Sequence, residues 1–115
     1  MPTENMQGVV SDGPQAGLRI LRLKGPLSLH TVFDFQTLVR AETSPSLIID
    51  FSGVPYVDSA GLGALVGAHV SAQKAQRKIS FAGMNTQVTA LLDMTRLRGM
   101  FSIYPTVEEA QRAAA

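Results

Sequence analysis

Short apolar runs separated by turn-forming residues predict the strands of this chain. Residues 8–10 and 18–24 flank Asp12-Gly13-Pro14 and Gly17, a pattern typical of a β-hairpin. Residues 47–51 form an almost continuously apolar run, which predicts a central strand covered on both faces. The remaining predicted strands are residues 78–82 and 102–104.

Apolar residues at helical spacing predict helices between these strands. The clearest helix covers residues 60–76, where Leu62, Leu65, Val66 and Val70 fall on one face. A helix over residues 29–40 would have Ser28 as its N-cap. The other two predicted helices are residues 85–94 and 106–115.

The order of these elements predicts an α/β fold. Strands that alternate with helices pair mostly in parallel through right-handed crossovers, and the N-terminal hairpin adds an antiparallel part. We therefore expect a mixed, mostly parallel β-sheet flanked by about four α-helices. The length of 115 residues predicts a single domain over residues 1–115, with residues 1–7 as a flexible N-terminus.

Composition and charge exclude several classes of function. The chain has no cysteine and only two histidines, so disulfides, thiolate metal sites and a zinc cage are not expected, and no cofactor is predicted. A net charge of +1 does not favour direct nucleic-acid binding. No apolar run reaches the roughly 18 to 20 residues that span a bilayer. We expect a cytoplasmic protein without a membrane partner.

Asp58 and Ser59 place a carboxylate and a hydroxyl where the best-defined helix begins. Ser59 is predicted as its N-cap, where the helix dipole would accommodate an added phosphate. Such a phosphate would carry about −1.5 to −2 charges beside Asp58. Gly61 and Gly63 lower helix stability but allow another backbone to approach closely. The alternative is an ordinary capped helix with glycines that ease packing.

Small residues form a second face of the same helix, beside the apolar one. This face allows close packing, either on the sheet or against a partner. Its members are Ala60, Ala64, Gly67, Ala68, Ser71 and Ala75.

The segment 47–63, which reads Leu-Ile-Ile-Asp-Phe-Ser-Gly-Val-Pro-Tyr-Val-Asp-Ser-Ala-Gly-Leu-Gly, closely resembles the signature of bacterial STAS-domain anti-sigma factor antagonists. The signature combines an apolar strand, a Val-Asp-Ser start and a glycine-containing helix. The resemblance continues through residues 79–83, 88–97 and 101–110, so it covers nearly the whole chain.

This resemblance implies the STAS fold and a partner-switching cycle. The unphosphorylated chain would bind an anti-sigma factor that is also a serine kinase, and would thereby release a sigma factor. Phosphorylation of Ser59 would end that binding, and a serine phosphatase would restore it. The partner-binding residues that the resemblance implies are Ser28, Asp58, Ser59, Ala60, Gly61, Leu62 and Gly63.

The chain departs from the family pattern at two positions. The family often has Gly-x-Leu-Asp before its first helix, whereas residues 25–28 read Gly-Pro-Leu-Ser. A Leu-Thr-Gly-Leu pattern is frequent near the C-terminus, where residues 94–97 read Met-Thr-Arg-Leu. Ser28 is then more simply explained as an N-cap than as a partner contact.

Two other classes of function remain open. Ser59 could be a catalytic nucleophile, but its neighbours do not match Gly-x-Ser-x-Gly and neither His30 nor His69 has a convincing place as its base, so we expect no enzyme activity. His69 is expected to be a packed or partly exposed histidine. Related STAS domains also serve as scaffold or sensor modules in multiprotein signalling assemblies, and a weak homodimer stays open.

Overall fold

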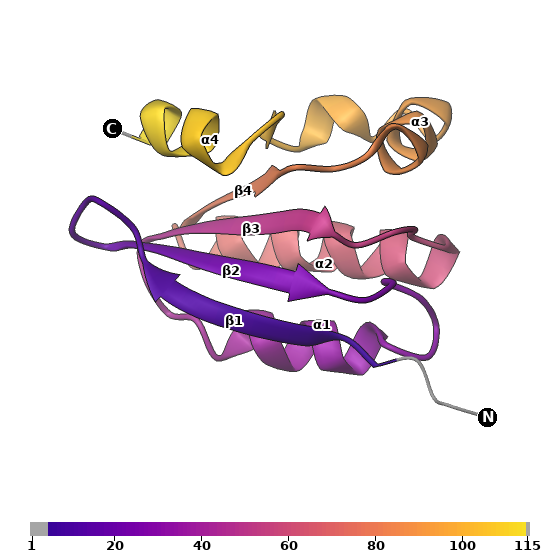
Figure 1. Ribbon diagram of the computed structural model, residues 1–115, viewed down its shortest axis with the longest axis horizontal. Helices are drawn as coiled ribbons and strands as arrows, with labels where there is room; N and C mark the ends of the chain where they lie inside the picture. Colours follow the sequence, from indigo (N-terminus) through magenta and orange to yellow (C-terminus); the bar gives the residue numbers. More distant parts are fainter. Residues whose placement is uncertain (1–4, 115) are drawn as a thin grey trace.

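The computed structural model describes residues 5–114, and its elements follow the predicted order (Figure 1). A short 3-10 helix, η1, is the one addition to that order among the described residues. In chain order the elements are β1 (Gln7–Asp12), β2 (Leu18–Lys24), α1 (Val32–Arg40), β3 (Ser46–Gly53), α2 (Ser59–Lys74), β4 (Lys78–Ala82), α3 (Thr86–Met94), η1 (Arg98–Met100), β5 (Ile103–Tyr104) and α4 (Val107–Ala114).

The strands form one sheet in the order β1-β2-β3-β4-β5. β1 pairs antiparallel with β2, and the other neighbouring strands pair in parallel, which confirms the predicted mixed sheet. Helices α1 and α2 lie on one face of the sheet, whereas α4 lies on the other and packs on β3, β4 and β5 (Figure 1). Both faces of the central strands are therefore covered.

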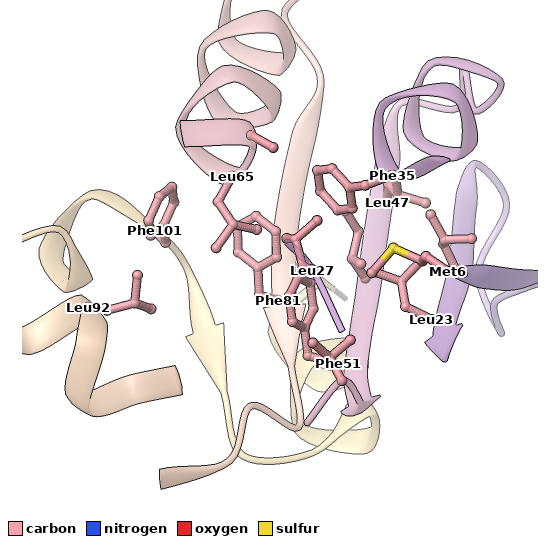
Figure 2. Packing of buried hydrophobic residues seen from close by; sticks show 14 residues of the cluster. Met6, Leu23, Leu27, Phe35, Leu47, Phe51, Leu65, Phe81, Leu92 and Phe101 are labelled. Carbon is pink, nitrogen blue, oxygen red and sulfur yellow. The ribbon is translucent and has the colours of Figure 1, made fainter. Parts of the chain in front are cut away.

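The larger core cluster lies between the sheet and the α1–α2 layer. Four phenylalanine rings cross it edge to face, with centroids 6.4 Å apart for Phe35 and Phe51, 5.6 Å for Phe51 and Phe81, and 5.4 Å for Phe81 and Phe101 (Figure 2). Edge-to-face rings at these separations attract each other beyond the area that they bury. These rings join α1, β3, β4 and the segment before β5 into one core.

A smaller cluster fills the space under α4. Alternate residues of the parallel strands point to the two clusters, so Ile48 of β3 faces α4 while Ile49 faces the larger core. This alternation explains the continuous apolar run that the sequence shows in β3. The buried members of the smaller cluster are Leu18, Ile20, Ile48, Ala82, Val107 and Ala110.

Helix α1 begins later than predicted, and Ser28 is not its N-cap. Residues 28–31 form a turn, α1 starts at Val32, and Thr31 holds the N-cap position without a side-chain capping bond. The Thr31 hydroxyl instead accepts a hydrogen bond from the Ser28 N–H at 2.9 Å and donates one to the Pro26 carbonyl at 2.7 Å. The Thr31 hydroxyl thus bonds groups of the turn, and α1 begins only after this turn, at Val32.

The predicted apolar face of α2 was only partly right. Of its four members Leu65 alone is fully buried, while Leu62 and Val66 are half-buried and Val70 is exposed. The small-residue face borders both α1 and the sheet. Ala64 and Ala68 contribute to the larger core, and a gap of about 100 Å³ is lined by Ala64, Gly67, Ala68 and Ser71 of α2 with four residues of α1. Small side chains let the two helices approach closely.

The prediction of a flexible N-terminus over residues 1–7 is wrong for Met6 and Gln7. Residues 1–4 lie outside the described residues. Met6 is buried in the larger core and its N–H lies 3.4 Å from the Asp34 carboxylate, and Gln7 already begins β1. The thioether of Met6 fills space beside Leu23, which holds this part of the chain against the core (Figure 2).

The structure at the end of α3 explains how residues 94–97 form a turn without the glycine of the family pattern. Arg96 has a φ of 58°, and the N–H of Leu97 donates to the Leu92 carbonyl at 2.9 Å. This is the helix-ending geometry in which the left-handed residue is usually glycine and the next residue makes an apolar contact. Leu97 packs against the larger core, so the turn forms although Arg96 replaces the usual glycine.

We predict that Arg96→Gly stabilises the domain by about 0.5 to 1 kcal/mol, because glycine has no side chain to strain in this conformation. Urea unfolding measures the change. Arg96→Ala is the matched control, because it removes the same charge but keeps a Cβ on the residue with the positive φ. A gain for both variants, or for neither, would contradict the backbone argument.

Candidate functional site

The predicted switch residue lies at the carboxyl end of the central strand. β3 ends at Gly53, the chain crosses a short loop, and Ser59 is the first residue of α2, with its side chain exposed. The segment between β2 and α1, residues 25–31, lies beside this loop through a parallel bridge between Leu27 and Val57. The structure therefore brings together the two segments that the resemblance assigned to partner binding.

Asp58, not Ser59, is the N-cap of α2. Its Oδ1 accepts a hydrogen bond from the Gly61 N–H at 2.9 Å, and its Oδ2 accepts one from the Leu29 N–H at 3.0 Å. The extended backbone of Asp58 turns the carboxylate back over the first helical turn. Ser59 therefore follows the cap, and its hydroxyl is not needed to start the helix.

The local hydrogen bonds stabilise the charged form of Asp58. Its pKa is lowered chiefly by the hydrogen bond from the Gly61 N–H, with smaller contributions from the Leu29 and Ala60 N–H groups and from the charge of His30, and desolvation opposes them. The carboxylate thus fixes a negative charge next to Ser59. It also bridges the start of α2 to the turn that precedes α1.

Gly61 is the point at which the two segments touch. The Leu27 N–H donates to the Tyr56 carbonyl and the Leu27 carbonyl accepts from the Asp58 N–H, both at 3.1 Å. A Cβ on Gly61 would overlap that carbonyl oxygen and lie 2.9 Å from the Leu27 Cγ. Gly61 is buried, so the glycine serves the contact between these segments of the chain itself.

The remaining predicted partner residues differ in their access to solvent. Ser59 and Gly63 are exposed, and a Cβ on Gly63 would meet no atom within 4 Å. Ala60 and Leu62 are half-buried. Ser28 is buried, and its hydroxyl accepts a hydrogen bond from the His30 N–H at 3.3 Å.

Two exposed apolar side chains were missed by the sequence reasoning: Leu29, whose N–H donates to Asp58, and Phe33, four residues further along the chain. Leu29 is 66% exposed and Phe33, in the first turn of α1, is 76% exposed. The spacing of α1 contained a signal for Phe33, because a helix that buries Phe35 turns a residue two positions earlier away from the core. Large exposed apolar groups next to a functional position are typical of a protein-binding surface.

The structure places His69 far from Ser59. His69 lies ten positions after Ser59, about 15 Å along the helix axis. Its ring is half-buried and packs edge-on against Phe101 with centroids 5.5 Å apart, which confirms the predicted packed histidine. Within residues 5–114 no group of three histidine, aspartate or glutamate side chains could hold a metal ion. None of the helices described there is long and apolar enough to cross a membrane.

Comparison with known families settles which fold family this site belongs to. Residues 10–110 match the sequence model of the STAS domain. The chain belongs to the STAS domain family. The family match spans both segments of the site and all but the first part of β1 and the end of α4.

Solved structures support the STAS fold. An anti-sigma factor antagonist from Mycobacterium paratuberculosis superposes with a TM-score of 0.81 at 22% identity, covering 94% of this chain and 92% of that one. The phosphorylated form of the Bacillus cell fate determinant SpoIIAA has a TM-score of 0.67 at 18% identity, covering 95% and 100%. The murine anion transporter Solute Carrier 26 family member A9 matches with a TM-score of 0.75 at 20% identity, over 96% of this chain but 22% of that one.

We predict opposite effects of alanine at the two glycines of the STAS signature. Gly61→Ala should lower the free energy of unfolding by about 1 to 3 kcal/mol, because the new Cβ would displace the Leu27 backbone. Gly63→Ala should raise it by about 0.5 to 1 kcal/mol through helix propensity alone. Urea unfolding of both variants measures the difference, and a shift of the same sign in both would refute the assignment of Gly61 to the internal contact.

We predict that Asp58→Ala lowers the free energy of unfolding by about 1 kcal/mol at neutral pH, through loss of the cap. The pKa of Asp58 is lower than its ordinary value of 3.8, so the charged cap stabilises the fold above that pH and this contribution is lost as pH falls through the lower folded value. Denaturant unfolding at neutral pH and at about pH 2.5 measures the free energy of unfolding of Asp58→Ala and of the parent protein. The difference between these two free energies should be smaller in acid. Ser59→Ala is the control, with no such pH dependence expected.

Proposed function

We propose that this STAS domain is an anti-sigma factor antagonist of the bacterial cytoplasm, controlled by phosphorylation of Ser59. The unphosphorylated domain binds an anti-sigma factor with serine kinase activity, and this binding releases a sigma factor for transcription. A serine phosphatase acting on phosphorylated Ser59 restores the binding form. The domain itself is a binding module and not an enzyme, so Ser59 is the substrate hydroxyl of its partners.

The position of Ser59 is the observation that carries this proposal. Its side chain is exposed at the first position of α2, where a kinase can reach it. Asp58 already caps the helix through Gly61, so modification of the Ser59 hydroxyl removes no bond that starts α2. A phosphate can therefore change the surface without unfolding the domain.

The charge next to Ser59 supplies a mechanism for release. A phosphoserine adds about −1.5 to −2 charges beside the Asp58 carboxylate. Leu29 and Phe33 lie exposed on the adjoining turn and first turn of α1, and would be buried by a bound partner. Burying a phosphate together with these apolar groups would weaken binding. The phosphate would lose its hydration, and it would be repelled by the Asp58 carboxylate.

A second candidate function is a scaffold or sensor module. The similarity to a domain that makes up 22% of a much longer transporter chain favours it, because it places a STAS fold within a larger assembly. In that role the same exposed surface would bind other proteins without a phosphorylation cycle. The two functions differ in their partners and in their response to charge at position 59.

We predict that Ser59→Ala binds the partner kinase like the parent protein, whereas Ser59→Asp binds it at least about tenfold more weakly, because the interface cannot desolvate the added charge. The kinase would be captured on the unphosphorylated domain, identified by mass spectrometry, and titrated calorimetrically against each variant. Circular dichroism would verify that both variants fold.

Thr43→Asp provides a matched control, because this exposed threonine precedes β3, whereas Ser59 follows its carboxyl end. It should bind like the parent protein. Equal affinities for Ser59→Ala and Ser59→Asp would rule out the charge switch. Capture of other STAS proteins alone, with Ser59 unmodified in native cells, would favour the scaffold function.

A further inference from the structure

The edge of β4 is longer than the strand that covers it. β4 spans five residues, Lys78–Ala82, whereas β5 has two and pairs only with Phe81 and Ala82. The first three residues of β4 therefore pair with β3 on one side and have no strand on the other within residues 5–114. An uncovered strand edge presents backbone groups that can pair with another chain.

The backbone N–H and C=O groups of β4 point alternately toward β3 and toward the β5 edge. The Phe81 N–H donates to the Ser102 carbonyl at 2.9 Å and the Gly83 N–H to the Tyr104 carbonyl at 3.1 Å, so these residues face β5. The Lys78 N–H donates to the Pro45 carbonyl at 2.8 Å, on the β3 side. Because directions alternate along a strand, the N–H and C=O of Ile79 face the uncovered edge.

A groove lies at this edge and extends across the amino ends of β2 and β3, where Leu18, Ser46 and Leu47 line it. It has a volume of about 350 Å³ and is bounded by the last turns of α2, with His69 and Ala72, and by α4, with Ala110 and Ala113. Helices α2 and α4 lie on opposite faces of the sheet (Figure 1). The groove is therefore a slot between residues of these two helices, and Ile79 is among the β4 residues that line it. The slot lies in line with β5, which continues the same edge.

The groove has a positive charge bias. Arg77 and Lys78 line it, and no aspartate or glutamate is among the described residues that do. The Arg77 guanidinium donates to the Glu42 carbonyl at 2.6 Å, which fixes its position, while Lys78 is exposed. The hydroxyls of Ser80, Ser102 and Tyr104 add polar groups along the same lining. This chemistry favours an acidic occupant over a basic or purely apolar one.

We propose that this groove binds an extended acidic segment of a partner protein, which adds a strand to β4 in line with β5. Ile79 supplies backbone hydrogen bonds, the slot between α2 and α4 accommodates small side chains, and Arg77 and Lys78 select acidic residues. The groove begins at the amino end of β4, whereas Ser59 follows the carboxyl end of β3. In a parallel sheet these are opposite ends, so the second partner can bind while the Ser59 surface is occupied.

Titration of the ¹⁵N-labelled domain with two synthetic peptides tests this proposal. Both are blocked hexapeptides, one alternating glutamate with valine and the other alternating lysine with valine. The acidic peptide should shift the Ile79 amide resonance and slow its hydrogen exchange, because a free N–H becomes hydrogen-bonded. The basic peptide should leave both unchanged.

Two variants and one control locate the contact. Lys78→Glu should weaken binding of the acidic peptide roughly fivefold or more by reversing a groove charge, and Ala113→Phe should do so by filling the slot. Lys74→Glu makes the same charge change outside the groove lining and should bind like the parent protein.

Four outcomes would overturn the proposal. Equal effects of the two peptides would remove the acidic preference, and shifts confined to the surface around Ser59 would place the contact elsewhere. Protection of Ile79 that rises with protein concentration alone, or that appears with glutarate in place of the peptide, would assign the groove to a second copy or to a small carboxylate. Each of these results is independent of whether Ser59 controls sigma-factor release.

Discussion

The close contact between the Leu27 backbone and the first turn of α2 is the constraint on which the functional surface depends. Gly61 allows the approach because any side chain would overlap the Leu27 carbonyl oxygen. Asp58 then joins the two segments, with one carboxylate oxygen on α2 and the other on the Leu29 N–H. The turn before α1 and the start of α2 therefore form a single surface, although more than 25 residues separate them in the chain.

This arrangement separates the residue that starts the helix from the residue at which we propose phosphorylation. Asp58 satisfies the helix start, and the neighbouring Ser59 stays exposed. If Ser59 were the cap, a phosphate on its hydroxyl would compete with a bond that the helix needs. With the cap on Asp58, the added charge acts on whatever binds the surface, and the exposed Leu29 and Phe33 supply the apolar area that such an interface requires.

The sheet also places two surfaces of different character at its two ends. The carboxyl end of β3 leads into the exposed serine and its apolar neighbours. The start of β4 lies in an open groove, because β5 is too short to cover the whole edge. Arg77 and Lys78 give this groove a positive charge. The first surface would bind by side-chain burial and the second by backbone pairing. The two surfaces lie apart because the central strands are parallel. In such a sheet every strand-to-helix connection leaves from the same end.

Local sequence patterns predicted the order of elements, the central strand and a serine at the start of α2. The apolar run of β3, the turn residues of the hairpin and the Val-Asp-Ser motif can each be recognised within a few residues. Three features could not be predicted in this way: Asp58 caps α2, Gly61 faces inward while Gly63 faces solvent, and Ser28 is buried. Each of these features depends on the short distance between the turn that contains Leu27 and the start of α2. The hydrophobic periodicity of a sequence does not indicate the distance between segments that are far apart in the chain.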